Sequence, residues 1–127
     1  MNYIFVAIGG FFGALARYSI GLLETGNYLF PAGTLTVNLI GCLFLGWFST
    51  YAAGKAAHPR LILLIGTGFT GSFTTFSSFS VETWELIQSG HMLTGLMNIG
   101  MSIIAGLFLV LVGMQIARTM LKQSASS

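Results

Sequence analysis

The sequence predicts an all-α integral membrane protein with four transmembrane helices. Its 127 residues are 54% hydrophobic and only 6% charged, with a mean hydropathy of +0.84. Soluble domains carry about 25% charged residues, so this chain has too few charges to cover a water-exposed surface. Long uncharged runs separate the charges, and a helix needs about 20 apolar residues to cross the hydrocarbon. We therefore expect a multi-pass protein of the cell (inner) membrane.

The spans follow one another in a single domain with short connections. They are predicted at about 3–23, 33–53, 61–86 and 92–117, followed by a polar C-terminal tail, 118–127, whose last residues we expect to fray. Pro31 and Pro59 fit the starts of the second and third helices, where an N–H has no helical partner. The runs are twice as long as barrel strands and do not alternate, which excludes a transmembrane β-barrel. The N-terminus lacks the features of a signal peptide, so we expect the first span to remain.

The third span is too polar to be a plain membrane anchor. Residues 66–80 carry no charge, yet they combine three glycines, four phenylalanines and many hydroxyls. Irregular backbone at membrane depth is tolerated where it lines a cavity or pore. We therefore expect the helix to break at about 71–75. The glycines also match G-x-G-x-x-G, but a match inside a membrane span is not a dinucleotide site.

Several side chains inside the spans can face an ion. Aromatic ring edges are electropositive and hydroxyls donate hydrogen bonds, so the third span offers a site for a small, hard anion, although core packing also explains phenylalanines at this spacing. Arg17 costs about 2.5–3.5 kcal/mol at membrane depth, so it either faces protein or water or snorkels to the interface. Asn38 can bridge helices or donate its amide to a ligand.

Small residues recur where helices would touch, and plain packing explains them. They are Gly9, Gly13, Gly41, Gly46, Ser102 and Gly106.

The sequence contains few residues that could carry out enzyme chemistry. His58 and His91 fall in predicted connections, the single Cys42 forms no intrachain disulfide, and no set of nucleophile, base and acid is present. We expect no enzyme activity.

The basic residues gather on one side of the membrane. Four spans place both termini and the second connection together, on the side that holds Lys55, Arg60, Arg118 and Lys122, whereas the opposite connections hold no Lys or Arg. The positive-inside rule predicts that this side is cytoplasmic. No basic stripe is present, so we expect no nucleic-acid partner. Four thin helices hardly enclose a pore, so transport implies an oligomer, most simply a dimer.

Three sequence blocks together resemble the Fluc (CrcB) family of fluoride channels. They are residues 9–18 (GGFFGALARY), 33–41 (GTLTVNLIG) and 71–82 (GSFTTFSSFSVE), so the resemblance covers nearly the whole chain. It implies passive, fluoride-selective export across the lipid bilayer. It also implies a dual-topology protein that forms an antiparallel homodimer with two pathways, and a third helix broken near its middle.

The same resemblance implies roles for individual residues. The fluoride pathway would comprise Asn38, Phe76, Ser77, Ser78, Phe79, Asn98 and Ser102. In it the two rings line the path, the serines lie between them, and Asn38 is the amide donor near them, while the fourth-helix pair is the weakest match. Arg17 and Glu82 would lie at the aqueous vestibule. The backbone carbonyls of Gly71 and Thr74 would bind a structural Na⁺ at the dimer centre.

Other functions remain open. A small multidrug-type exporter also has four helices, but its proton coupling needs a carboxylate within the membrane, and the only acid near the first helix is Glu24, at its end. A non-transporting assembly subunit would not need a hydroxyl-rich third span. The charge bias leaves two partners open, a second copy or a chain of opposite orientation, and the homodimer is the expectation.

Overall fold

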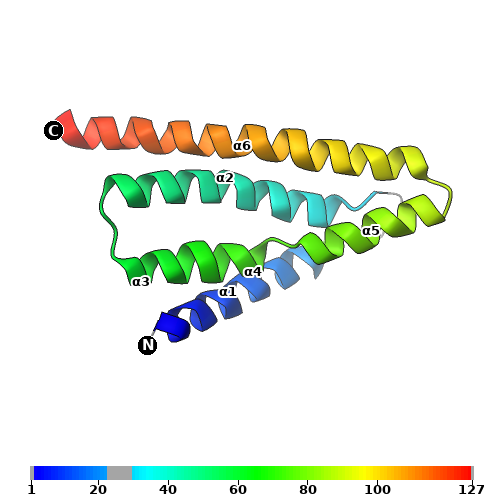
Figure 1. Ribbon diagram of the computed structural model, residues 1–127, viewed down its shortest axis with the longest axis horizontal. Coiled ribbons are helices and arrows are strands. Elements are labelled where there is room, and N and C mark those ends of the chain that lie inside the picture. Colours follow the sequence, from blue (N-terminus) through cyan, green and yellow to red (C-terminus); the bar gives the residue numbers. More distant parts are fainter. Residues whose placement is uncertain (1, 23–29, 127) are drawn as a thin grey trace.

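The computed structural model describes residues 2–22 and 30–126, and within them it contains helices and the turns between them. The elements are α1 (Asn2–Leu22), α2 (Ala32–Gly54), α3 (Pro59–Ile62), the π-helix η1 (Leu63–Thr70), α4 (Gly71–Phe73), α5 (Phe76–Gln88) and α6 (Met92–Ser126) (Figure 1). Four helical stretches are long and apolar enough to cross a membrane: Asn2–Leu22, Ala32–Gly54, Pro59–Gln88 and Met92–Ala125. The predicted all-α class with four spans is confirmed.

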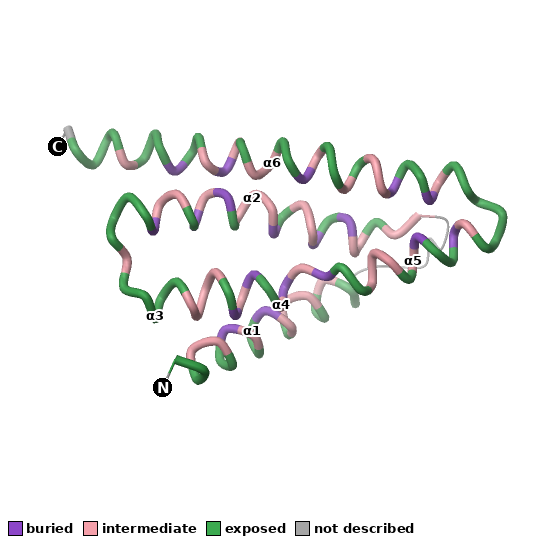
Figure 2. The backbone as a smooth tube through the Cα atoms, viewed as in Figure 1, coloured by how far each residue is buried: buried purple, intermediate pink, exposed green. Residues whose placement is uncertain are grey.

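The helices associate mainly in two pairs. In the first pair α2 packs along α6, and in the second α1 packs against η1 and α4 of the third span. The last part of the third span, α5, contacts α6 instead. Figure 1 places both described chain ends at the same end of the molecule as the turn between α2 and α3. Buried positions lie along the helix contacts, and the outward faces are exposed (Figure 2). On α6, for example, Ile104 is 73% exposed, so this face meets lipid or another chain.

Glycines allow the helix backbones to touch. A Cβ atom added to Gly9 would overlap the carbonyl oxygen of Leu64 in η1, and one added to Gly113 would overlap the carbonyl oxygen of Leu43 in α2. Any larger residue would push these helices apart. The contacts predicted for the small residues are confirmed for Gly9, Gly13, Gly41, Gly46 and Gly106.

The turns that follow α2 and α5 have the same backbone motif. The N–H groups of Ala57 and His91 each reach back five residues to a helical carbonyl, at 2.9 and 2.8 Å. Such a Schellman cap needs a left-handed residue one position earlier, and here these residues are Ala56 (φ 48) and Gly90 (φ 86). Gly90 takes this conformation at no steric cost, whereas Ala56 is strained in it.

The last helix is longer than the sequence predicts. α6 continues through Ser126, so the predicted fraying of the last residues is wrong for the described part of the tail. Contacts with the end of α2 hold these turns. The Lys55 ammonium donates to the Ser124 hydroxyl at 2.6 Å, and the Leu121 side chain lies against Gly54. The sequence pattern missed this because the stabilising contacts come from α2.

Candidate functional site

Two residues with extended backbone separate α4 from α5. Thr74 (ψ 159) follows the last residue of α4, and Thr75 (φ −145, ψ 122) precedes the first residue of α5. The Thr74 side chain folds back, and its hydroxyl donates to the carbonyl oxygen of Thr70 at 3.0 Å. The Thr74 N–H donates to the same oxygen at 3.1 Å. The chain therefore leaves one helix and enters the next within two residues.

Asn38 of α2 holds the extended backbone of Thr75. The Asn38 amide donates to the Thr75 carbonyl oxygen at 3.0 Å, and its oxygen accepts from the Thr75 N–H at 2.8 Å. Backbone groups away from water need such partners, and one side chain provides both. An amide has two N–H donors, so one further donor of Asn38 is available to a ligand.

These side-chain bonds divert two N–H groups from helical carbonyls. In a continuous α-helix the Gly71 carbonyl would accept from the Thr75 N–H, which here donates to Asn38. The Thr74 carbonyl would likewise accept from the Ser78 N–H, which here donates to the Thr75 hydroxyl at 3.1 Å. Both carbonyls have thus lost their helical donor, and neutral oxygens of this kind suit a hard cation.

The Thr75 hydroxyl organises the first turn of α5. As N-cap it accepts from the Ser78 N–H, and it also donates to the Ser78 hydroxyl at 3.1 Å and lies 3.2 Å from the Ser77 hydroxyl. Thr75 is only 8% exposed. Its cap satisfies one of the N–H groups that a helix start leaves unpaired.

A cavity of about 410 Å³ lies beside this junction and collects most of the predicted residues. Its lining includes Asn38, Gly71, Thr74, Phe76, Phe79 and Ser102. We call it the phenylalanine cavity. The Phe76 and Phe79 rings are 5.8 Å apart and tilted by 41°, and Phe76 is 80% exposed. The phenylalanine cavity is therefore open on the side of Phe76.

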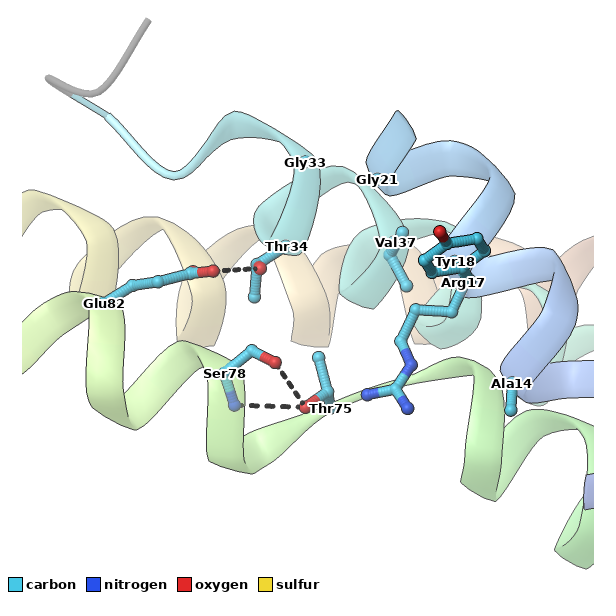
Figure 3. A pocket seen from close by; sticks show the side chains of 10 residues that line it. All are labelled: Ala14, Arg17, Tyr18, Gly21, Gly33, Thr34, Val37, Thr75, Ser78 and Glu82. Atoms are coloured by element: carbon cyan, nitrogen blue, oxygen red, sulfur yellow. Dashed lines mark hydrogen bonds between the residues drawn. The ribbon is translucent and has the colours of Figure 1, made fainter. Parts of the chain in front are cut away.

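A second cavity, of about 280 Å³, also adjoins Thr75 (Figure 3). We call it the arginine cavity. Figure 3 shows the Arg17 side chain reaching from α1 toward the α4–α5 junction, across the cavity from Glu82. The Thr34 hydroxyl donates to Oε1 of Glu82 at 2.7 Å, and the Ser78 side chain faces the same space. Thr75 lines both cavities.

Three predicted residues are placed differently from the rest. Asn98 lines neither cavity. It is 1% exposed, and its amide donates to the Thr83 hydroxyl at 2.9 Å. Ser77 is exposed and lines neither cavity, whereas Ser78 lines only the arginine cavity. The oxygen of the Asn98 amide and the hydroxyl of Ser102 have no hydrogen-bond partner within the described part of the chain.

Sequence reasoning missed the central position of Thr75 and the pairing of Thr34. The local signal was the threonine at position 75, because threonine is one of the residues preferred as an N-cap. Thr34 meets Glu82 across 48 residues of sequence, and no local pattern encodes that contact. Within the described residues, no group of three or more His, Cys, Asp or Glu side chains can hold a metal ion.

Comparison with known proteins gives a consistent result. A family model described as "CrcB-like protein, Camphor Resistance (CrcB)" matches residues 4–114. Fluoride-specific ion channel FluC 1 of Bacillus cereus (strain ATCC 14579) is 44% identical over 125 residues, which cover 96% of this chain and 87% of that protein. FluC of Oceanobacillus iheyensis is 42% identical, covering 91% of both chains. FluC 2 of Listeria innocua is 42% identical, covering 98% of this chain and 97% of that protein.

Proposed function

This chain belongs to the CrcB family, and we propose that it is a passive, fluoride-selective ion channel that exports F⁻ across the membrane. Relatives that match nearly its whole length are named fluoride-specific ion channels. A channel moves its ion down a gradient without covalent chemistry, so the chain is not an enzyme.

The observation that supports this function most directly is the pair of cavities that share Thr75. Moving a bare small anion into a low-dielectric medium costs tens of kcal/mol by Born estimates, so a pore must replace water with fixed donors. The phenylalanine cavity offers ring edges, the second N–H of Asn38 and the Ser102 hydroxyl. These groups attract an anion without the full charge that would trap it.

In this proposal F⁻ enters through the arginine cavity and passes the Thr75 hydroxyl into the phenylalanine cavity. Arg17 raises the local concentration of anions at the entrance, and the Thr34 hydroxyl donates to one oxygen of the Glu82 carboxylate across the same cavity. The Thr75 hydroxyl donates its one proton to the Ser78 hydroxyl, so the proton of Ser78 can be donated to the ion in the arginine cavity. Asn98 donates to Thr83 and does not donate to the ion. Its role is to hold α6 in place against α5.

The dimer and its ion belong to the same proposal. An antiparallel partner completes the open side of the phenylalanine cavity, which gives two pathways per dimer. In its simplest form the partner is a second copy of this chain. The third span works as a broken helix, and the Gly71 and Thr74 carbonyls of both subunits bind a structural Na⁺ at the dimer centre. Support comes from the loss of their helical donors to Asn38 and Thr75.

Liposomes test the channel function directly. Purified protein is reconstituted with internal fluoride or chloride, and efflux is followed with an ion-selective electrode after valinomycin clamps the potential. Detergent reconstitution inserts chains in both directions, so the assay does not depend on orientation in the cell. We expect fluoride release without a proton or sodium gradient. Equal chloride release, or an absolute need for a proton gradient as in an exporter, would overturn the assignment.

A further inference from the structure

A shallow apolar groove lies on the outward face of α6, near the middle of the helix. Its volume is about 370 Å³, and its lining consists of Gly100, Met101, Ile104, Ala105 and Phe108. Small residues leave this space open, and no heavy atom would lie within 4 Å of a Cβ added to Gly100. The groove is separate from the phenylalanine cavity, because α6 lines that cavity with Ser102 and Ile103 instead.

The same face of α6 carries two basic residues toward its C-terminal end. Residues at positions i, i+4, i+7 and i+11 share one face of a helix, and Leu111, Gln115, Arg118 and Lys122 have this spacing. All four are exposed. α6 contains no Asp or Glu, so it offers no carboxylate to the two cations. The face is therefore apolar in its middle and positively charged toward its end.

The distance between the groove and the two bases matches one leaflet of a membrane. From Ile104 to the point midway between Arg118 and Lys122, the helix rises by about 24 Å. Half of a bilayer with its headgroups is about 20–22 Å thick, and a helix tilted by about 20° needs slightly more length to cross it. When the two bases lie among the lipid phosphates, the groove lies near the bilayer midplane, where acyl chains end.

We propose that this face of α6 binds an anionic phospholipid, with the lipid phosphate between Arg118 and Lys122 and the end of an acyl chain in the groove. Side chains four residues apart on a helix are neighbours, so both reach one phosphate. The guanidinium donates two parallel hydrogen bonds to phosphate oxygens, and the ammonium adds a point charge. Each base favours anionic over neutral lipid by about fivefold, and the two together by about 25-fold.

A phospholipid fits this face better than a second copy of the chain does. Two α6 helices that meet along this face offer no carboxylate to either pair of bases, in either relative direction, because α6 has none. A phospholipid supplies an apolar chain and a negative charge together, in the order in which the helix presents their partners. The proposal does not depend on fluoride transport, so the lipid site and the channel function can fail separately.

Native mass spectrometry tests the phosphate contact. Purified protein in an uncharged detergent is titrated with phosphatidylglycerol, or with phosphatidylcholine that has the same acyl chains. We expect phosphatidylglycerol to bind at least tenfold more tightly. The double variant Arg118→Gln, Lys122→Gln should reduce this preference to less than about twofold.

The matched control is Lys55→Gln, Arg60→Gln, which removes the same charge from exposed positions at the same end of the molecule. This control should keep the preference for phosphatidylglycerol. An equal loss in both double variants would show a general attraction of charges instead of a site, and would overturn the proposal. Equal binding of the two lipids to the parent protein would overturn it as well.

The acyl-chain contact has its own test. Gly100→Leu fills the groove and should weaken phosphatidylglycerol binding at least threefold, whereas Ser19→Leu, which adds an apolar side chain on an exposed position of α1, should not. Glycerol 3-phosphate has the phosphate without acyl chains, so millimolar amounts should not displace the lipid. Displacement would reduce the site to one for free phosphate. Unchanged lipid binding in Gly100→Leu, with loss of the dimer mass, would assign the groove to a second copy of the chain.

Discussion

Asn38 and Thr75 form two hydrogen bonds with each other, through both backbone groups of Thr75 and both ends of the Asn38 amide, at 3.0 and 2.8 Å. They lie 37 residues apart in the sequence and on different spans. This pair joins α2 to the extended residues between α4 and α5. Phe76 follows Thr75 directly as the first residue of α5, and Phe79 lies three residues further along the same helix.

Asn38→Leu should destabilise the protein and abolish transport. The change leaves a buried N–H and C=O of Thr75 unpaired, and such groups cost about 1–3 kcal/mol. Thermal unfolding in detergent measures the stability, and the liposome assay measures flux. Gln115→Leu, an exposed substitution on α6, is the control and should leave both unchanged. If Asn38→Leu unfolded like the wild-type chain, the pair would have no structural role.

Phe76 and Phe79 should act through their ring edges rather than their volume. Replacing either with Ile or Met keeps an apolar side chain but removes the electropositive edge. We expect fluoride efflux to fall at least tenfold while cross-linking still detects the dimer. Phe108→Ile, on the outward face of α6 where the ring is 64% exposed, should conduct normally. Near-normal fluoride flux in both site variants would show that these rings contribute only to packing.

Gly71→Ala should weaken dimer assembly without destabilising the single chain. Gly71 has φ −64, and no heavy atom would lie within 4 Å of an added Cβ, so a methyl group fits within the single chain. Alanine in a helix is favoured over glycine by about 0.8–1.0 kcal/mol. Any loss of assembly must then come from the partner side or from the ion. Cross-linking yield against temperature measures the dimer.

Thr74→Ala is the companion variant, because it leaves the backbone carbonyl in place. We expect it to keep its dependence on sodium, whereas Gly71→Ala should weaken dimer assembly. In the parent protein, replacing sodium with a large organic cation should lower dimer stability, since an ion that binds only the assembled form stabilises it. Identical dimer stability in both salts would remove sodium from the proposal.

The two Schellman caps should respond in opposite directions to substitution. Ala56→Gly relieves a left-handed alanine and should stabilise the chain by about 1 kcal/mol, whereas Gly90→Ala creates the same strain and should destabilise it by about as much. Both positions are exposed, so packing changes little. Thermal unfolding of the two single variants and the double variant gives the comparison. Shifts in the same direction would show that the φ angles do not control stability here.

The sequence predicted the membrane class because it depends on composition and on the length of apolar runs. It also singled out Phe76, Phe79 and Asn38, which line one cavity. It did not separate Ser77 from Ser78, since adjacent serines look alike until a helix phase is known. The hydrogen-bond partners of Asn98 and Asn38 could not be predicted from the sequence either, because those contacts join different spans.

The C-terminal end of α6 is a rigid point at which a second protein can be attached. The 35 residues of α6 extend about 52 Å, which is more than the hydrocarbon core needs. The last turns of α6 are held to α2 through Lys55 and Leu121. A helical fusion partner joined in register after Ala125 would therefore move with the membrane spans instead of swinging from a flexible tail. Such a fusion would add the mass and asymmetry that electron cryomicroscopy needs for particle alignment.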